Sequence, residues 1–190
     1  MKLNLITKSA IALMLATPLL ASAESQLVNG AGAAAARLNF RVVIPRVLFL
    51  GVGTGAAVTP LATNAAIDLV TFDYTLNPND VGTGLAAGAI TGNVVPVRVF
   101  GNNGQIQIAV TNPANLVSGT DNIAFTQITA VSSDATNLAV PAFGGAAVSP
   151  VLNTTRITDR SANWTFSYAN AVNAAAGTYN GQATYTATMP

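Results

Sequence analysis

Oxygen-bearing side chains gather in one short stretch of the sequence, and they are the first candidates for metal binding or acid–base chemistry. The stretch DYTLNPND offers oxygens of the kind that calcium prefers, on Asp73, Asn77, Asn79 and Asp80. It lacks the regular spacing and the distal glutamate of an EF-hand loop, so a turn is the better interpretation. Asp68 and Asp73 are five residues apart and would point to opposite faces of a strand, which does not suit a general acid–base pair. We predict no metal ion and no cofactor.

The residue types that most enzymes use are scarce. The chain has no histidine and no cysteine, and its eight basic residues are Lys2, Lys8 and six arginines, against seven acidic residues. Without histidine or cysteine, the usual nucleophile–base systems and the usual zinc and copper sites lack their groups, and no disulfide can form. Six scattered arginines are too few to neutralise a phosphate backbone, so we expect no nucleic-acid partner. We predict that the protein is not an enzyme and has no catalytic residues.

One glycine-rich stretch imitates a cofactor site. Residues 47–55 read VLFLGVGTG, which resembles the first motif of S-adenosylmethionine-dependent methyltransferases, a buried strand followed by a glycine-rich turn. That family has an acidic residue inside the strand where this chain has Phe49. The helix that should follow is interrupted at Thr59-Pro60. We interpret the stretch as a strand that ends in a turn.

The N-terminus has the three parts of a secretory signal peptide. Lys2 and Lys8 supply the positive region, residues 10–20 the apolar region, and Ala21-Ser22-Ala23 the small-residue cleavage site. The signal peptide is therefore predicted over residues 1–23. No apolar run reaches the roughly 18–20 residues that a membrane helix needs. We expect an exported protein that is not an integral membrane protein.

The rest of the chain alternates apolar and polar residues with the period of β-strands. Residues 24–36 form an Ala/Gly-rich lead that we expect to be flexible, and residues 37–190 are predicted to be one all-β domain, an antiparallel β-sandwich. Charged residues make up 8% of the chain, about a third of the usual share, which suits a surface that tolerates contact with copies of itself. The expected strands are 37–44, 47–52, 68–76, 94–100, 105–111, 123–131, one around Trp164 to Tyr168, and 181–189.

Local signals refine this strand pattern. Pro96 lacks an N–H and therefore indicates an edge strand. The sequence Gly-Asn-Asn-Gly at 101–104 predicts a hairpin turn, and a change of phase near Thr126–Gln127 indicates a β-bulge.

Two further groups of residues have a structural and a functional interpretation. Trp164, Phe166 and Tyr168 share one face of a strand, where they form either a core stripe, which we favour, or an exposed platform for sugars. Asp159 beside Arg156 and Arg160 is interpreted as a solvated charge pair in a loop.

The two ends of the sequence resemble one family. The C-terminal AGTYNGQATYTATMP, residues 176–190, resembles the closing strand of chaperone–usher pilus subunits, in particular the cysteine-free colonisation fimbriae and the spore-coat-U-like proteins. Residues 38–44, followed by a proline and a second apolar strand, resemble the family's donor segment. In this chain a lead of about thirteen residues precedes that segment, whereas the family's donor segment usually starts near the mature N-terminus.

The resemblance implies an immunoglobulin-like sandwich that lacks one strand and is completed by a neighbour. The donor strand would carry Leu38, Phe40, Val42 and Ile44. It also implies a homopolymeric fimbrium or pilus with a role in cell adhesion, a periplasmic chaperone and an outer-membrane usher, and passage through the periplasm to the cell surface.

Two functions therefore remain open at this point. The first is a structural subunit of an extracellular fibre that assembles by β-strand donation. The second is a self-contained secreted β-sandwich that binds carbohydrate or matrix, in which residues 37–44 pair within their own domain.

Overall fold

The computed structural model describes residues 24–57, 61–111 and 113–190. Its internal contacts divide the chain into two units, residues 1–44 and residues 45–190, and we call the second unit the body. The predicted signal peptide and the Thr59-Pro60 step lie outside the described residues.

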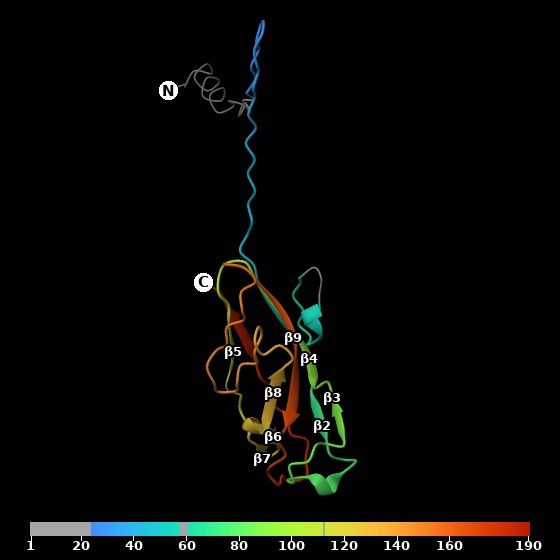
Figure 1. Cartoon of the computed structure of the whole chain (residues 1–190). Helices are drawn as coiled ribbons and strands as arrows, with labels where there is room; N and C mark the ends of the chain where they lie inside the picture. The colour runs from blue at the N-terminus through green and yellow to red at the C-terminus, as the bar shows by residue number, and fades with distance from the viewer. Residues whose placement is uncertain (1–23, 58–60, 112) are drawn as a thin grey trace, which may run out of the picture. The chain divides into compact units, whose positions relative to one another are not determined.

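The body is built from antiparallel strands (Figure 1), as the sequence predicts. Within the described residues, the helical turns are three short 3₁₀ helices, η1 (Thr54–Ala57), η2 (Pro78–Asp80) and η3 (Phe125–Gln127). No helix among these residues is long and apolar enough to span a bilayer. The strands are β1 (Leu48–Val52), β2 (Thr71–Asp73), β3 (Ala89–Thr91), β4 (Val94–Gly101), β5 (Gln107–Val110), β6 (Leu116–Ser118), β7 (Asp121–Ile123), β8 (Ile128–Ser132), β9 (Thr158–Tyr168) and β10 (Tyr185–Thr188).

The larger sheet has four strands in the order β1-β4-β9-β8. β4 is its most regular strand, because every second side chain is buried while those between are partly exposed. Antiparallel partners share a face, so Leu50 opposite Val99 and Val95 opposite Trp164 contribute to one apolar surface. The alternating sequence thus gives this sheet one face for the core and one face for solvent.

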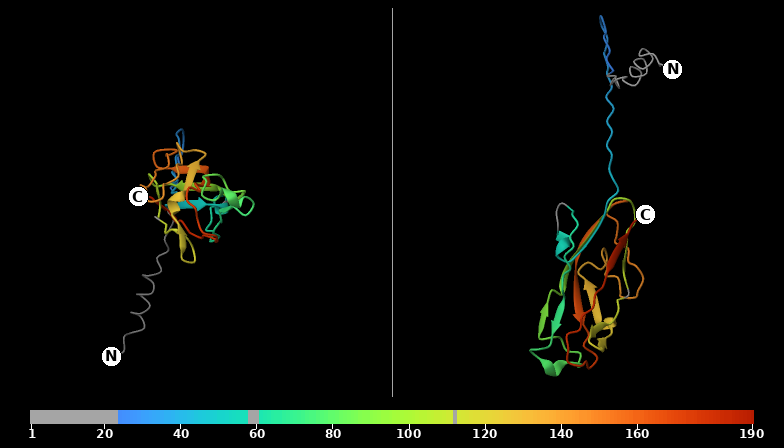
Figure 2. Two further views of the ribbon diagram at one scale, coloured as in Figure 1. Left: turned by 90° about the horizontal axis from the view of Figure 1, so that it is seen from below. Right: turned by 180° about the vertical axis from the view of Figure 1, so that it is seen from behind.

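The second layer is the pair β10-β5. Its apolar side chains, among them Ile106, Ile108 and Met189, pack against the inner face of the larger sheet in one core cluster. Trp164 of β9 lies 5.2 Å from Tyr185 of β10, measured between ring centroids, and links the two layers. The result is a small antiparallel sandwich, and further views of it are given in Figure 2.

The hairpin predicted at residues 101–104 does not form. β4 pairs with β1 and β9, whereas β5 pairs with β10, so the Gly-Asn-Asn-Gly turn carries the chain from one sheet to the other. Both edges of β4 are already occupied, which leaves β5 no place beside it. The prediction was wrong because turn chemistry specifies a reversal of the chain but not the partner of the next strand.

Pro96 is not on an edge strand, although it lacks the N–H that a central strand needs. The Pro96 carbonyl accepts a hydrogen bond from Gly53 N at 2.8 Å, just beyond the end of β1. The nitrogen and carbonyl of a strand residue point to the same side, so the Pro96 nitrogen also faces Gly53. The acceptor that this nitrogen would have used, the Gly53 carbonyl, is bonded to Ala56 N at 2.9 Å. No ladder hydrogen bond is lost, and the proline is accommodated in a central strand.

The other strands depart from the prediction in both directions. β9 is longer than the stretch expected around Trp164 to Tyr168, and β3 and β6 were not expected, whereas other strands are shorter. Of the expected strand 68–76, only β2 is regular, and it pairs with β3 in a two-stranded sheet. The predicted bulge near Thr126–Gln127 is instead the 3₁₀ turn η3, which separates β7 from β8. In β10 the predicted alternation holds, with Tyr185 and Ala187 half-buried between exposed threonines.

The described part of the first unit, residues 24–44, contains no regular strand or helix. Residues 24–37 double back on themselves (Figure 1), and two hydrogen bonds from Arg37 to Glu24, of 2.7 and 2.9 Å, close the loop. Gln26 accepts a bond from Ala35 N at 2.9 Å, and the turn includes Gly30 with a φ of 109°. The Arg37 side chain lowers the pKa of Glu24.

Candidate functional site

The predicted donor residues lie in an extended, unpaired segment. Leu38, Phe40, Val42 and Ile44 are 75%, 86%, 82% and 77% exposed. No strand is assigned between residue 33 and residue 47, so the alternating pattern is present without a partner strand. Every residue from 38 to 44 is exposed, including Val43 at 74%. Large apolar side chains gathered in this way are unusual on a folded protein and are typical of surfaces for association.

The C-terminal strand β10 is bonded on one side only. It pairs with β5 over Tyr185–Val110 to Thr188–Gln107, and within the described residues its other edge has no strand partner. The opposite edge of β5 is covered, because Ile108 exchanges two hydrogen bonds with Val148, of 2.8 and 2.9 Å. The two-stranded sheet therefore has one closed edge and one open edge, and an open edge is a template for another strand.

Tyr185 is the inward-facing aromatic residue of this open strand. Burial raises the pKa of Tyr185 to about 12. Its hydroxyl is buried and has no hydrogen-bond partner in the described structure, whereas its ring packs on Trp164. A buried hydroxyl without a hydrogen bond is energetically costly.

Asn102 fixes the first residues of the body. Its side-chain NH₂ donates to the Pro45 carbonyl at 2.8 Å, and its side-chain oxygen accepts from Val47 N at 2.8 Å. Its own backbone N–H donates to the Val47 carbonyl at 3.3 Å. One asparagine thus bonds both backbone groups of Val47 and holds the chain where residues 1–44 join the body.

Asn103, the next residue, fixes the other end of the body. Its side chain donates to the Pro190 carbonyl at 2.8 Å and accepts from Arg156 at 3.0 Å. Arg46 donates to the Met189 carbonyl. The turn after β4 therefore connects the start of β1 with the end of β10, and both lie at the same end of the body (Figures 1 and 2).

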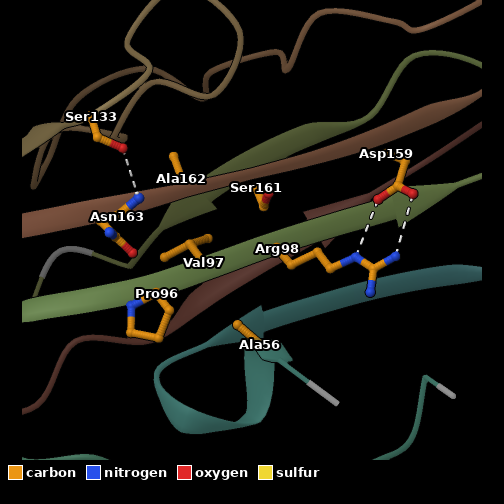
Figure 3. Close-up of a pocket in the computed structure, with 9 residues that line it drawn as sticks. All are labelled: Ala56, Pro96, Val97, Arg98, Ser133, Asp159, Ser161, Ala162 and Asn163. Atoms are coloured by element: carbon orange, nitrogen blue, oxygen red, sulfur yellow. Dashed lines mark hydrogen bonds and ion pairs between the residues drawn. The ribbon is translucent and has the colours of Figure 1, made fainter. Parts of the chain in front are cut away.

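An open concavity of about 680 Å³ lies on the outer face of the larger sheet (Figure 3). Arg98 and Asp159 form a two-bonded ion pair along one side, with distances of 3.2 and 3.3 Å. On the other side the Ser133 hydroxyl accepts a bond from the backbone N–H of Asn163 at 2.9 Å. The concavity offers hydrogen-bonding groups, and its one carboxylate is engaged by Arg98. The lining residues are Ala56, Pro96, Val97, Arg98, Ser133, Asp159, Ser161, Ala162 and Asn163.

The aromatic stripe belongs to the core. Trp164 has no exposed surface and Phe166 is 8% exposed, which confirms the favoured interpretation for these two residues, whereas Tyr168 is partly exposed. Two of the three rings that a sugar platform would use are therefore buried. Asp159 is not in a loop with its neighbours in sequence but in β9, where Arg98 of β4 is its partner. The prediction was wrong because it paired charges by sequence distance rather than across the sheet.

The glycine-rich stretch ends as a strand and a turn, as interpreted from the sequence. β1 is followed by Gly53, with a φ of 92°, and by the 3₁₀ helix η1. Asp68 accepts bonds from Thr54, one from its backbone N–H at 2.6 Å and one from its hydroxyl at 2.9 Å. This carboxylate caps the turn and is used structurally.

The acidic stretch considered for calcium also forms turns. Asp73 accepts a bond from Thr75 N at 2.8 Å, which lowers the pKa of Asp73. Asn77 donates to Asp80 at 2.6 Å. Within the described residues no three or more histidine, cysteine, aspartate or glutamate side chains are grouped so that they could hold a metal ion.

Sequence reasoning missed the roles of Asn102 and Asn103, which it assigned to a hairpin turn. Nothing in the local sequence signals that their side chains reach residues 45–47 and 189–190, because those partners are more than fifty residues away.

Comparison with protein-family models, with curated proteins and with solved structures found no match to the chain.

Proposed function

We propose that the protein is a structural subunit of an extracellular fibre that assembles by β-strand donation, of the chaperone–usher pilus type. The observation that carries the proposal is the exposure of Leu38, Phe40, Val42 and Ile44, each at least 75%, on alternate positions of an unpaired segment. The donor strand is residues 38–44 of one copy, and the acceptor is the open β10 edge of another copy.

The strand order of the body supports this assignment. An immunoglobulin constant-type sandwich has the sheets A-B-E-D and C-F-G. When the hairpins β2-β3 and β6-β7 are set aside, the order β1-β4-β9-β8 corresponds to A-B-E-D, and β5-β10 corresponds to C-F. Strand G, which would pair with F, has no counterpart among the described residues. The missing strand would lie along the open edge of β10.

The energetics of strand donation support it as well. Burying each of the four apolar side chains contributes about 1.5–3 kcal/mol, and together they give roughly 6–12 kcal/mol as an upper value. A whole domain is typically stable by about 5–15 kcal/mol. A donated strand would therefore change the stability of the acceptor by an amount similar to its own stability, which explains why such a subunit would need a chaperone before assembly.

The predicted signal peptide completes the proposal. The subunit would be exported to the periplasm, met there by a chaperone, passed to an outer-membrane usher and displayed at the cell surface. The partners in this scheme are further copies of the same chain, joined head to tail, and the two assembly proteins. The fibre would serve adhesion.

The test is assembly of the full exported protein, followed by gel filtration and negative-stain microscopy. We expect oligomers or fibres that survive mild detergent. Replacing all four residues with serine, as L38S/F40S/V42S/I44S, should abolish them, because the strand would have no apolar face to insert. The control is N39S/V43S, which alters the other face of the same segment and should still assemble. A four-serine variant that assembles like the parent protein contradicts strand donation by residues 38–44.

A further inference from the structure

Strand β1 is a possible acceptor for the donor segment and lies close to it in sequence. β1 begins at Leu48, only four residues after Ile44, and within the described residues it pairs with β4 alone. The intervening sequence, Ile44-Pro45-Arg46-Val47, has proline at the position that favours a β-turn. A reversal of the chain there would lay residues 38–44 along the free edge of their own β1. In such a molecule residues 38–44 would pair with their own chain and could not be donated to another copy.

The hydrogen bonds of Val47 oppose that turn. A tight turn over these four residues would be closed by a bond from Val47 N to the Ile44 carbonyl. In the structure Val47 N donates to the side-chain oxygen of Asn102 at 2.8 Å, and the Val47 carbonyl accepts from Asn102 N. The side-chain NH₂ of Asn102 also donates to the Pro45 carbonyl at 2.8 Å. The backbone N–H of Val47, which would close the turn, is therefore already bonded to Asn102.

The register of a two-residue turn also opposes it. With Pro45 and Arg46 as the loop, Ile44 would face Val47, and therefore Arg41 would face Leu50. Leu50 lies on the core side, opposite the fully buried Val99. Antiparallel partners share a face, so this register turns Arg41 toward the core and the apolar residues toward solvent. A buried unpaired guanidinium is strongly unfavourable.

A three-residue turn would correct the register but requires a conformation that Val47 resists. With residues 45–47 as the loop, Ile44 would face Leu48, so Val42 would face Leu50 and Phe40 would face Val52, all on the core side. The third residue of such a loop adopts the left-handed region, which suits glycine and is a genuine outlier for a β-branched residue. Val47 is β-branched, and Asn102 bonds both of its backbone groups.

We infer that Asn102 and Val47 keep the donor segment off its own β1 and so reserve it for another copy of the chain. This inference rests on the proposed function for its consequence, but the block on self-pairing is a property of a single molecule. The two residues act together, because Asn102 holds Val47 in line with β1 and the β-branched side chain disfavours the three-residue turn, which has the correct register. They determine the partner of the segment without contributing to its apolar face.

The test compares two variants of the full chain that differ at one residue. Val47→Gly with Asn102→Ala frees the backbone and permits the left-handed turn, whereas Val47→Ala with Asn102→Ala frees the backbone and still disfavours it. We expect the glycine variant to be monomeric, to show amide exchange at residues 38–44 slowed by more than about tenfold, and to melt about 5 °C above the alanine variant. The alanine variant should keep fast exchange there and still assemble.

Equal exchange and equal melting temperatures in the two variants would overturn the inference. If Asn102→Ala prevents folding in both, Asn102→Ser replaces it in the same pair of variants, because the shorter side chain still frees Val47 N and the Pro45 carbonyl. Assembly of the unaltered protein is read separately. If it never assembles, the proposed function fails, whereas the exchange difference between the glycine and alanine variants still decides whether self-pairing is blocked.

Discussion

Residues 37–44 and strand β4 have the same alternating sequence pattern, but the apolar side chains are buried in β4 and exposed in residues 37–44. In β4 the side chains of Val95, Val97 and Val99 alternate with exposed positions and are 6%, 1% and 0% exposed. In the donor segment the alternating apolar residues are at least 75% exposed. β4 lies between β1 and β9, whereas residues 37–44 form no strand in the part of the chain that the structure describes. Alternation in sequence thus specifies which face is apolar, and the partner strand decides whether that face is buried.

The largest expected effect separates these two regions in the unassembled protein. Trp164→Ala should destabilise the fold by about 3–5 kcal/mol, because it removes a fully buried ring from the core. Phe40→Ala should change stability by less than about 0.5 kcal/mol, because its ring is exposed. Urea unfolding of dilute protein, shown to be monomeric by light scattering, measures both. A large loss of stability in Phe40→Ala would mean that the segment is already buried in the monomer.

A smaller effect is expected when the missing partner is supplied as a peptide. A synthetic peptide of residues 37–44, added to the unassembled L38S/F40S/V42S/I44S protein at about 100 times its dissociation constant, should stabilise it by about 2.7 kcal/mol. Thermal melting would show this as a rise of about 5–10 °C. The matched control has the same composition with the apolar residues grouped at one end, as RNRLFVVI, so that the alternation is broken. Equal stabilisation by both peptides would contradict an alternating acceptor groove.

Much of the architecture follows from the sequence because it depends on local alternation. The period of two predicts the all-β class, the inward face of β10 and the buried Trp164 stripe, since each is a property of one strand. The strand partners do not follow in the same way. Pro96 indicated an edge and lies in a central strand, because the acceptor that its nitrogen would have needed is used within the turn after β1.

The candidate site follows from the sequence only in part, for the same reason. The four apolar residues of the proposed donor strand are visible as a pattern, and the structure adds that they are exposed and belong to no strand among the described residues. The role of Asn102 depends on its side chain reaching Pro45 and Val47, across 57 and 55 residues of sequence. A polar residue in a turn has no periodicity that could indicate such a contact, and the Gly-Asn-Asn-Gly pattern favoured a simpler explanation.

Tyr185 is partly buried and so lies between the buried valines of β4 and the exposed donor segment. It gives the smallest expected effect on stability, and this effect depends on pH. Burial raises the pKa of its hydroxyl to about 12 in the folded protein, against about 10 in the unfolded chain. Below pH 10 the hydroxyl is protonated in both states and contributes no pH dependence. Between pH 10 and pH 12 the unfolded chain loses this proton first, so stability falls as the pH rises.

The loss attributable to Tyr185 should be about 0.5 kcal/mol between pH 10 and pH 11, roughly half of the full linkage value of about 1 kcal/mol, because the side chain keeps some contact with water. Tyr74 and Tyr168 also have pKa values raised by burial, so the measurement is the difference between the parent protein and Tyr185→Phe in urea unfolding at several pH values. Tyr185→Phe should be at least as stable at neutral pH, because it removes a buried hydroxyl that has no partner. If the free energy of unfolding falls equally with pH above pH 10 in the parent protein and in Tyr185→Phe, water reaches this hydroxyl in the monomer. The Tyr185 side chain of β10 would then be exposed to solvent, as the donor segment is.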